Sequence, residues 1–485
     1  MKYSLSIFFI LIISFSCFAQ KRNNVWCFGD SSGIDFNQSV PVPIATSLDT
    51  RGSCVSISDS VGNMLFYANT RATLSGNTTR VWSRNNQIMQ NGDSVVGRGW
   101  YNELVIVPMP DNPNRYYLFS VGVTSFYGFY YSIIDMSLNS GLGIVVQKNI
   151  QLNPYKAWDA LGAVKHGNGR DWWVITKDYE SMNSQDSLHV YLISPTGIQE
   201  SIQRIGVSFT GGMGNMTFSK DGSRFLFTAY NGLIETMDFD RCTGIFSNAN
   251  VILNSYNYRI TGSTLSPNGN VAYYSNADAI SDLVQLDLTA SNVWATRDTI
   301  ISLSHPFETG GSLRLAPDNK IYWSCAWTNQ INFNYPYQDS MYHTENMNLS
   351  VINNPDVVGS GCNFSLYGFN LGGKRCYWGL PNNPDYDLGP VVGSVCDTLS
   401  NGLNENENNL IRIYPNPVGN SAYITIDNEQ IFSAEAINTL SQSFRLSFEK
   451  SGSKFKIDTS QLPSGIYILY LKSHEKEYII KFLKI

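Results

Sequence analysis

Aromatic and charged side chains stand together where several segments of the chain lead into apolar runs. The residues with this placement are Arg51, Trp100, Tyr101, Glu103, Trp158, Asp159, Arg259 and Glu308. Aromatic rings with neighbouring charged groups suit a ligand that offers flat apolar faces and hydroxyl groups, such as a sugar. One hypothesis is therefore a binding site for a polysaccharide or a protein. The other is that the Trp and Tyr rings fill gaps between structural elements.

The acidic members of this set allow a second chemistry, the cleavage of glycosidic bonds, which needs two carboxyl groups at a defined separation. The sequence does not single out such a pair, and it contains no nucleophile elbow, phosphate loop or paired-histidine zinc motif. We expect no cofactor and no metal site. Asp-rich turns such as 111–114 and 220–223 could bind a structural calcium ion, although they lack the alternating acidic residues of a calcium-binding loop.

The elements that must position these residues form a repeat of about 50 residues. Each unit has an apolar strand, a turn with Asp or Asn next to Gly, and an aromatic strand, as in Met216–Phe227, Thr264–Tyr274 and Leu313–Trp323. Such turns connect paired strands because their central residues need positive φ angles. The pattern predicts an all-β fold, a β-propeller over residues 24–385. We expect seven blades, with six or eight left open, and a ring closed between Val25–Phe28 and Arg375–Gly379.

In a propeller, the segments entering the inner strands meet at one end of the central channel, which is why the candidate residues could share a site. The propeller stretch also resembles a group of secreted Bacteroidetes proteins with WD40-like or TolB-like repeats. The matching segments are Trp26–Asn37, Val81–Asn85, His166–Trp172 and Gly379–Asn382. This resemblance implies a fold and no particular activity.

The first residues predict export. Lys2 precedes an apolar run from Leu5 to Phe15, and small residues follow up to Ala19, which is the pattern of a secretory signal peptide over residues 1–19. The compartment is then oxidising, and we expect Cys362–Cys376 as the first candidate disulfide and Cys27–Cys54 as the second. No later segment is apolar enough to span a membrane. The net charge of −6 does not favour nucleic acid as a partner.

A polar linker over residues 395–409 separates the propeller from a C-terminal module, residues 410–485. Its short alternating segments predict a small immunoglobulin-like β-sandwich. The module resembles the type A C-terminal sorting domain of the Bacteroidetes type IX secretion system. The matching residues are Tyr414, Pro415, Asn416 and Pro417 at its start, Leu462, Gly465 and Tyr467 in its middle, and Lys481 near the end.

The resemblance implies export through the type IX secretion machinery as a partner, to the medium or the outer cell surface. Together these observations favour a secreted or surface-bound propeller that binds an extracellular glycan or protein and is not an enzyme. A glycoside hydrolase or lyase is the first alternative. A structural protein of the cell envelope or gliding surface is the second.

Overall fold

The computed structural model describes residues 21–71, 77–97, 101–123, 127–179, 187–209, 211–278, 280–303, 308–327, 342–397, 413–425, 431–438, 442–451, 454–473 and 477–485. Its contacts divide the chain into two units, Met1–Ser400 and Asn401–Ile485. The expected signal peptide, and residues 398–409 of the expected linker, lie outside the described residues.

The described part of the first unit contains seven antiparallel sheets, so the expected number of blades is confirmed. The first two sheets have three strands each: β1 (Val25–Phe28), β2 (Asp30–Asp35), β3 (Val42–Asp49), β4 (Cys54–Ser58), β5 (Met64–Thr70) and β6 (Thr79–Ser83). The third and fourth contain β7 (Leu104–Pro108), β8 (Arg115–Gly122), β9 (Gly128–Asp135), β10 (Ile144–Asn153), β11 (Gly162–Lys165), β12 (Trp172–Lys177), β13 (Ser187–Ser194) and β14 (Gly197–Arg204).

The remaining three sheets contain four strands each and follow in chain order. Their strands are β15 (Gly214–Phe218), β16 (Arg224–Ala229), β17 (Leu233–Asp240), β18 (Ile245–Asn254), β19 (Ile260–Leu265), β20 (Val271–Asn276), β21 (Ser281–Asp287), β22 (Asp298–Leu303), β23 (Glu308–Leu315), β24 (Ile321–Trp327), β25 (Asn348–Ile352) and β26 (Phe364–Asn370). Helical turns are short: η1 (Asn139–Gly141), η2 (Val293–Thr296), α1 (Thr344–Met347) and η3 (Gly359–Cys362).

The repeated turn explains how each blade begins. Between β15 and β16, Gly222 has a φ of 76°, a conformation that favours glycine. The Asp221 side chain accepts a hydrogen bond from the Ser223 amide at 3.0 Å, which fixes the turn. Phe218 then pairs with Phe225 across the two strands. The register therefore places one large ring opposite another where the blade starts.

The ring closes through the chain's own C-terminal segment. Residues 379–382 run beside the start of β4, the first strand of the second sheet. The Gly379 amide donates to the Arg51 carbonyl at 3.1 Å, and the Asn382 amide donates to the Cys54 carbonyl at 2.9 Å. Asp30 and Arg375 form one antiparallel bridge. Arg375–Gly379 therefore does meet the first sheet, but its partner is Asp30 of β2 and not the expected Val25–Phe28 strand.

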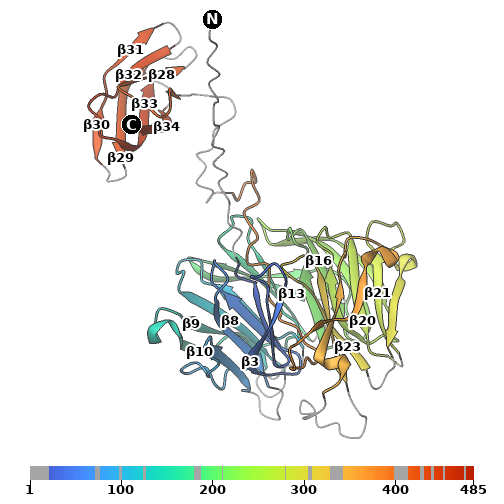
Figure 1. The fold of residues 1–485 in the computed structure, drawn as a ribbon. Coiled ribbons are helices and arrows are strands. Elements are labelled where there is room, and N and C mark those ends of the chain that lie inside the picture. Colours follow the sequence, from blue (N-terminus) through green and yellow to red (C-terminus); the bar gives the residue numbers. More distant parts are fainter. Residues whose placement is uncertain are drawn as a thin grey trace, which may run out of the picture. The chain divides into compact units, whose positions relative to one another are not determined.

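Packing between blades supplies the core. Trp26 of the first sheet contacts Tyr322 of the seventh at 6.0 Å between ring centres, and Figure 1 shows the strands of this unit in colour order, from blue β3 through green β16 and yellow β21 to orange β23. Trp26, Trp158, Trp172 and Trp323 are among the largest fully buried side chains. Each such ring stabilises the fold by about 2–3 kcal/mol through buried apolar area. Aromatic residues therefore do fill the gaps between blades.

The disulfide expectation is wrong. The structure joins Cys242 to Cys396, while Cys27, Cys54, Cys362 and Cys376 are buried thiols. Cys362 packs in the core between the sixth and seventh sheets, whereas Cys376 packs in the core between the seventh and first. Proximity in sequence does not bring these two thiols together. The Cys376 thiol instead donates to the Cys325 carbonyl at 3.4 Å.

The second unit has two four-stranded sheets around one apolar core. Its strands are β27 (Ile413–Tyr414), β28 (Ser421–Thr425), β29 (Ile431–Asn438), β30 (Ser443–Arg445), β31 (Phe448–Ser451), β32 (Lys454–Asp458), β33 (Gly465–Ser473) and β34 (Glu477–Lys484). Ala422 and Phe455 face the core from one sheet, and Leu469 and Phe482 face it from the other. The unit is therefore a β-sandwich. Among the described residues of the whole chain, no helix is long and apolar enough to cross a membrane.

Candidate functional site

Four of the sequence candidates gather where the inner strands begin. Arg51 precedes β4, Tyr101 and Glu103 precede β7, and Asp159 precedes β11. Asp159 accepts a hydrogen bond from the Asn102 amide at 2.8 Å, which links the entries of the third and fourth sheets. Trp158 lies beside Asp159 in the chain and is fully buried. The convergence that the repeat predicts is therefore present for these residues.

The remaining candidates do not extend this cluster. Trp100 lies outside the described residues, and for Glu308 only the backbone, which pairs with Trp327 in the seventh sheet, is described. Arg259 is exposed in the loop before β19. Its carbonyl accepts the Ala277 amide at 2.8 Å.

The cluster is a buried polar core and not an open mouth. Glu103 is 0% exposed and Asp159 is 2% exposed. Burial first, and then the neighbouring Asp159 charge, raise the pKa of Glu103 well above its ordinary value. Burial lowers the pKa of Arg51 to about 9. The expectation that these side chains line an accessible channel mouth is not met, because Trp378 covers Arg51 with its ring centre at 4.7 Å.

Asn382 divides the channel below this cluster. Its side-chain amide donates to the carbonyls of Leu104 and Leu161, each at 3.0 Å, and its oxygen accepts from Arg314 at 2.9 Å. Leu104 and Arg314 belong to the first strands of the third and seventh sheets, and Leu161 directly precedes the first strand of the fourth. One side chain thus spans the channel and connects three blades.

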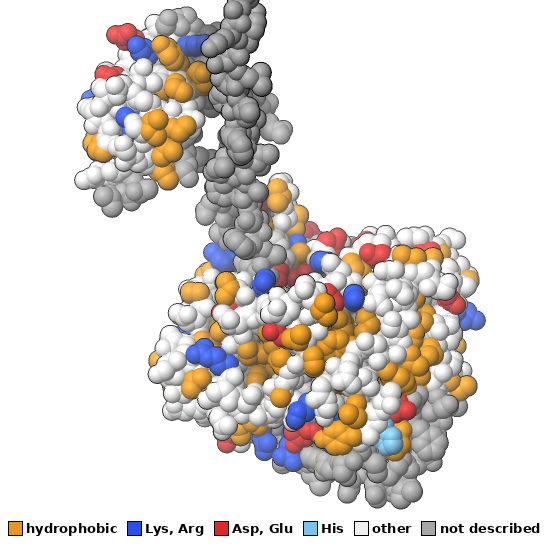
Figure 2. Space-filling model, in the orientation of Figure 1, with side chains coloured by type: hydrophobic (Ala, Val, Ile, Leu, Met, Phe, Trp, Pro, Cys, Tyr) orange, Lys and Arg blue, Asp and Glu red, His pale blue; other side chains and the backbone are white. Residues whose placement is uncertain are grey.

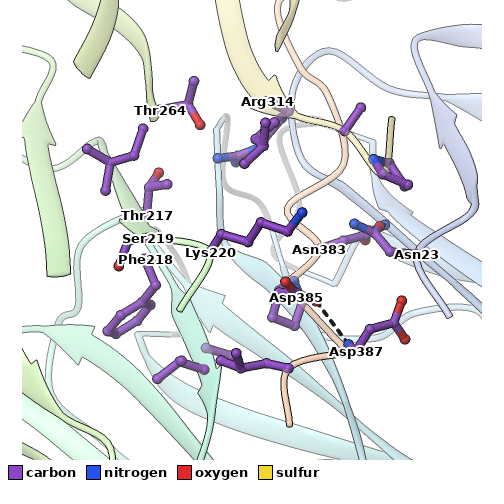
Figure 3. A pocket seen from close by; sticks show the side chains of 18 of the residues that line it. Asn23, Thr217, Phe218, Ser219, Lys220, Thr264, Arg314, Asn383, Asp385 and Asp387 are labelled. Carbon is purple, nitrogen blue, oxygen red and sulfur yellow. Dashed lines mark hydrogen bonds between the residues drawn. The ribbon is translucent and has the colours of Figure 1, made fainter. Parts of the chain in front are cut away.

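A cavity of about 670 Å³ lies on the other side of Asn382, toward the end where the inner strands finish. Figure 3 shows Phe218, Lys220, Asn383 and Asp385 around this space. Its apolar lining comes from residues such as Met216, Phe218, Leu265, Pro317 and Leu388, and its polar lining from Thr217, Thr264, Asn383, Asp385 and Asp387. The cavity therefore pairs an apolar wall with a set of hydrogen-bonding groups.

The polar wall carries two acids from the segment that closes the ring. The Asp387 amide donates to the Asp385 carboxylate at 2.9 Å (Figure 3). Burial raises the pKa of Asp385, and Lys220 and Lys165 oppose that rise. Burial, followed by the Asp385 charge, raises the pKa of Asp387 to about 6. Asp387 therefore changes charge near pH 6, and it can donate a hydrogen bond below that pH and only accept above it.

Sequence reasoning missed this second site. Asp385 and Asp387 follow the Gly379–Asn382 segment, and the polar run after it was a usable signal. Among the described residues, no group of three or more His, Cys, Asp or Glu side chains could hold a metal ion.

The residues proposed as a sorting motif cluster in the second unit. Tyr414, Pro415, Asn416 and Pro417 are exposed, and the Asn416 side chain accepts the Leu483 amide at 3.0 Å. Leu462 and Tyr467 are buried, and the Tyr467 hydroxyl donates to the Pro463 carbonyl at 2.9 Å. Gly465 opens β33, and the Lys481 backbone pairs with Ile468; the Lys481 side chain is not described. The entry motif is therefore fastened to the last strand.

A family model for the secretion system C-terminal sorting domain matches residues 412–485. This stretch is a sorting domain. It marks the protein for export through the type IX secretion system, to the cell surface or the medium. No curated protein sequence matches the chain significantly.

Solved structures resemble the propeller only distantly. A protein from Lactobacillus plantarum is 14% identical, with a TM-score of 0.44, and the match covers 75% of this chain and 99% of that one. A structure described as a putative 6-phosphogluconolactonase from Bacteroides uniformis is 13% identical, with a TM-score of 0.41 and coverage of 62% and 89%. The β-propeller domain of a Myceliophteria thermophila protein is 10% identical, with a TM-score of 0.37 and coverage of 62% and 92%.

Proposed function

We propose that this exported propeller is a binding module that holds the end of a glycan in its channel cavity. The observation that carries the proposal is the cavity of about 670 Å³, with Phe218 on one wall and Asn383 and Asp385 on the other. Ligand sites typically measure about 300–1,000 Å³ and combine apolar walls with a few convergent polar groups. A sugar matches this lining because its ring faces are apolar and its edges carry hydroxyl groups.

The test is a thermal-shift screen of the full chain against a panel of oligosaccharides. A ligand that binds only the folded state stabilises it by about 2.7 kcal/mol at a hundredfold excess over Kd. We expect at least one oligosaccharide to raise Tm, and we expect Lys220→Ala to weaken its binding because Lys220 lies across the cavity (Figure 3).

Lys148→Ala is the matched control, because Lys148 pairs with Asp93 at 3.7 Å on the third sheet and does not line the cavity. An absence of any shift across the panel contradicts the proposal and favours a protein ligand or a structural role at the cell envelope. If Lys220→Ala and Lys148→Ala weaken oligosaccharide binding equally, the ligand binds outside the channel cavity.

Hydrolysis of a glycosidic bond is a second candidate function, favoured by one observation. Asp385 and Asp387 both line the cavity and both have raised pKa values, as one expects of a carboxyl group that serves as a general acid. The buried Glu103–Asp159 pair does not suit this chemistry, because two carboxyl groups in contact leave no room for a sugar between them. Release of reducing sugar that Asp387→Asn abolishes would establish an enzyme.

A further inference from the structure

A second pocket lies near the opposite end of the channel, close to the buried Glu103–Asp159 cluster. Its volume is about 310 Å³, and it is lined by Tyr179, Gly211, Gly212, Met213, Tyr230 and Asn231. The Asp159 amide donates to the Gly212 carbonyl at 2.7 Å, which fixes the pocket to the entry of the fourth sheet. The Tyr230 amide donates to the Met213 carbonyl at 2.9 Å, which fixes its other side to the fifth. The pocket therefore bridges two blades.

Two glycines make the floor of this pocket out of backbone. A Cβ atom on Gly211 would stand 2.6 Å from the Trp158 ring, and one on Gly212 would stand 2.8 Å from the Tyr179 ring. A side chain at either position would overlap a ring that already lies against the backbone, so both positions require glycine. The pocket therefore has backbone atoms of Gly211 and Gly212 beside its two tyrosines.

A cation lies beside one of the lining tyrosines. The Lys156 ammonium lies 3.6 Å from the centre of the Tyr179 ring and 5.4 Å from that of Tyr127. None of the described residues lining the pocket is acidic. Asp178, which precedes Tyr179 in the chain, is engaged by the His189 ring at 3.0 Å. A ligand in this pocket thus meets tyrosine rings, the Asn231 amide and one cation.

We propose that this pocket binds one sugar unit of an acidic polysaccharide, with its carboxylate directed to Lys156 and its ring packed against Tyr179 and Tyr230. Carboxylate-bearing sugars match all three features, because they combine apolar ring faces, hydroxyl groups and negative charge. This site is independent of the channel cavity and shares no lining residue with it. The proposal for this pocket and the proposal for the channel cavity can therefore be tested separately.

The test uses the full chain with two soluble probes, alginate as the acidic glycan and laminarin as the neutral one. We expect alginate to bind more tightly than laminarin, and we expect its Kd to rise at least tenfold in Tyr230→Ala and in Lys156→Ala. The Lys156 effect should shrink as salt is raised, because exposed charge pairs are screened.

Tyr423→Ala is the matched control, because Tyr423 is an exposed tyrosine of the second unit. Gly212→Ala provides a second test, since its added methyl group displaces Tyr179 without removing a polar group. The proposal is overturned if alginate does not bind, if the two probes bind equally, or if Tyr423→Ala weakens binding as much as Tyr230→Ala. Unchanged alginate binding in Tyr230→Ala together with loss in Lys220→Ala would assign the glycan to the channel cavity instead.

Discussion

At the scale of single residues, His189 is a titratable group with two acidic partners. Its two ring nitrogens lie 3.0 Å from Asp178 and 2.6 Å from Glu200. Asn153, at the end of β10, donates to the same Glu200 carboxylate at 3.2 Å, so the cluster joins the third sheet to the fourth. Burial lowers the pKa of His189, but the hydrogen bonds to Asp178 and Glu200 outweigh it and raise the pKa above 6.5.

The raised pKa predicts how stability depends on pH. A histidine whose folded-state pKa exceeds its unfolded value contributes stability that is complete below about pH 6.5 and is lost as pH rises through the folded pKa. We therefore expect His189→Gln to lower Tm more at pH 6 than at pH 9, measured by thermal unfolding of the full chain.

His166→Gln is the control with the opposite sign. Burial lowers the pKa of His166, whose ring accepts the Asn168 amide at 3.0 Å. The contribution of His166 to stability therefore grows as pH rises toward the pKa that this histidine has in the unfolded chain. The argument fails if both variants show the same dependence on pH.

At the scale of elements, the segment that closes the ring is the most sensitive part of the propeller. Asn382→Ala removes two donors and one acceptor from the centre of the channel and leaves the Leu104 and Leu161 carbonyls without this partner. We expect the free energy of unfolding to fall by about 2–4 kcal/mol, because buried polar groups that lose their partners retain their desolvation cost. Denaturant unfolding of the full chain measures this loss.

Asn85→Ala is the matched control, since Asn85 is exposed in the turn after β6. A loss below about 0.5 kcal/mol is the normal result for such a surface change. A loss of that small size in Asn382→Ala would show that the segment does not hold the ring together.

The elements differ in how far the sequence predicts them. Turns such as 219–223 could be predicted because their φ angles and side-chain bonds are local. The meeting of Glu103 and Asp159 could also be predicted, since strand entries converge in a propeller. The burial of Arg51 beside them could not, because Trp378, far along the chain, covers it. The channel cavity was missed for the same reason: it exists where residues 382–389 pass, and only the folded chain reveals that path.

At the scale of the whole molecule, export depends on the sorting domain. We expect deletion of residues 413–485 to leave the propeller inside the cell envelope, because the domain carries the signal for type IX secretion. Fractionation and immunoblotting of medium, surface and periplasm measure the distribution. The truncated protein, which lacks residues 413–485, should still unfold cooperatively, because each unit has its own apolar core.

A milder change separates loss of the signal from loss of the fold. Tyr467 packs in the core of the sorting domain, whereas Tyr414 is 75% exposed. Tyr467→Ala should unfold that domain, but Tyr414→Ala should leave it folded and affect export only through contacts with the machinery. If the truncated protein without residues 413–485 is secreted at the normal level, another part of the chain directs export.

The position of the Cys242–Cys396 disulfide has a mechanical consequence. Residues 379–383 close the ring, and Cys396 is the next covalent anchor along the chain. A pull on the residues beyond Cys396 would reach this disulfide first and pass through the two sulfur atoms into the fifth blade. Residues 379–383 would then not carry that force. The disulfide thus shields the segment that closes the ring from any force applied to the C-terminal unit.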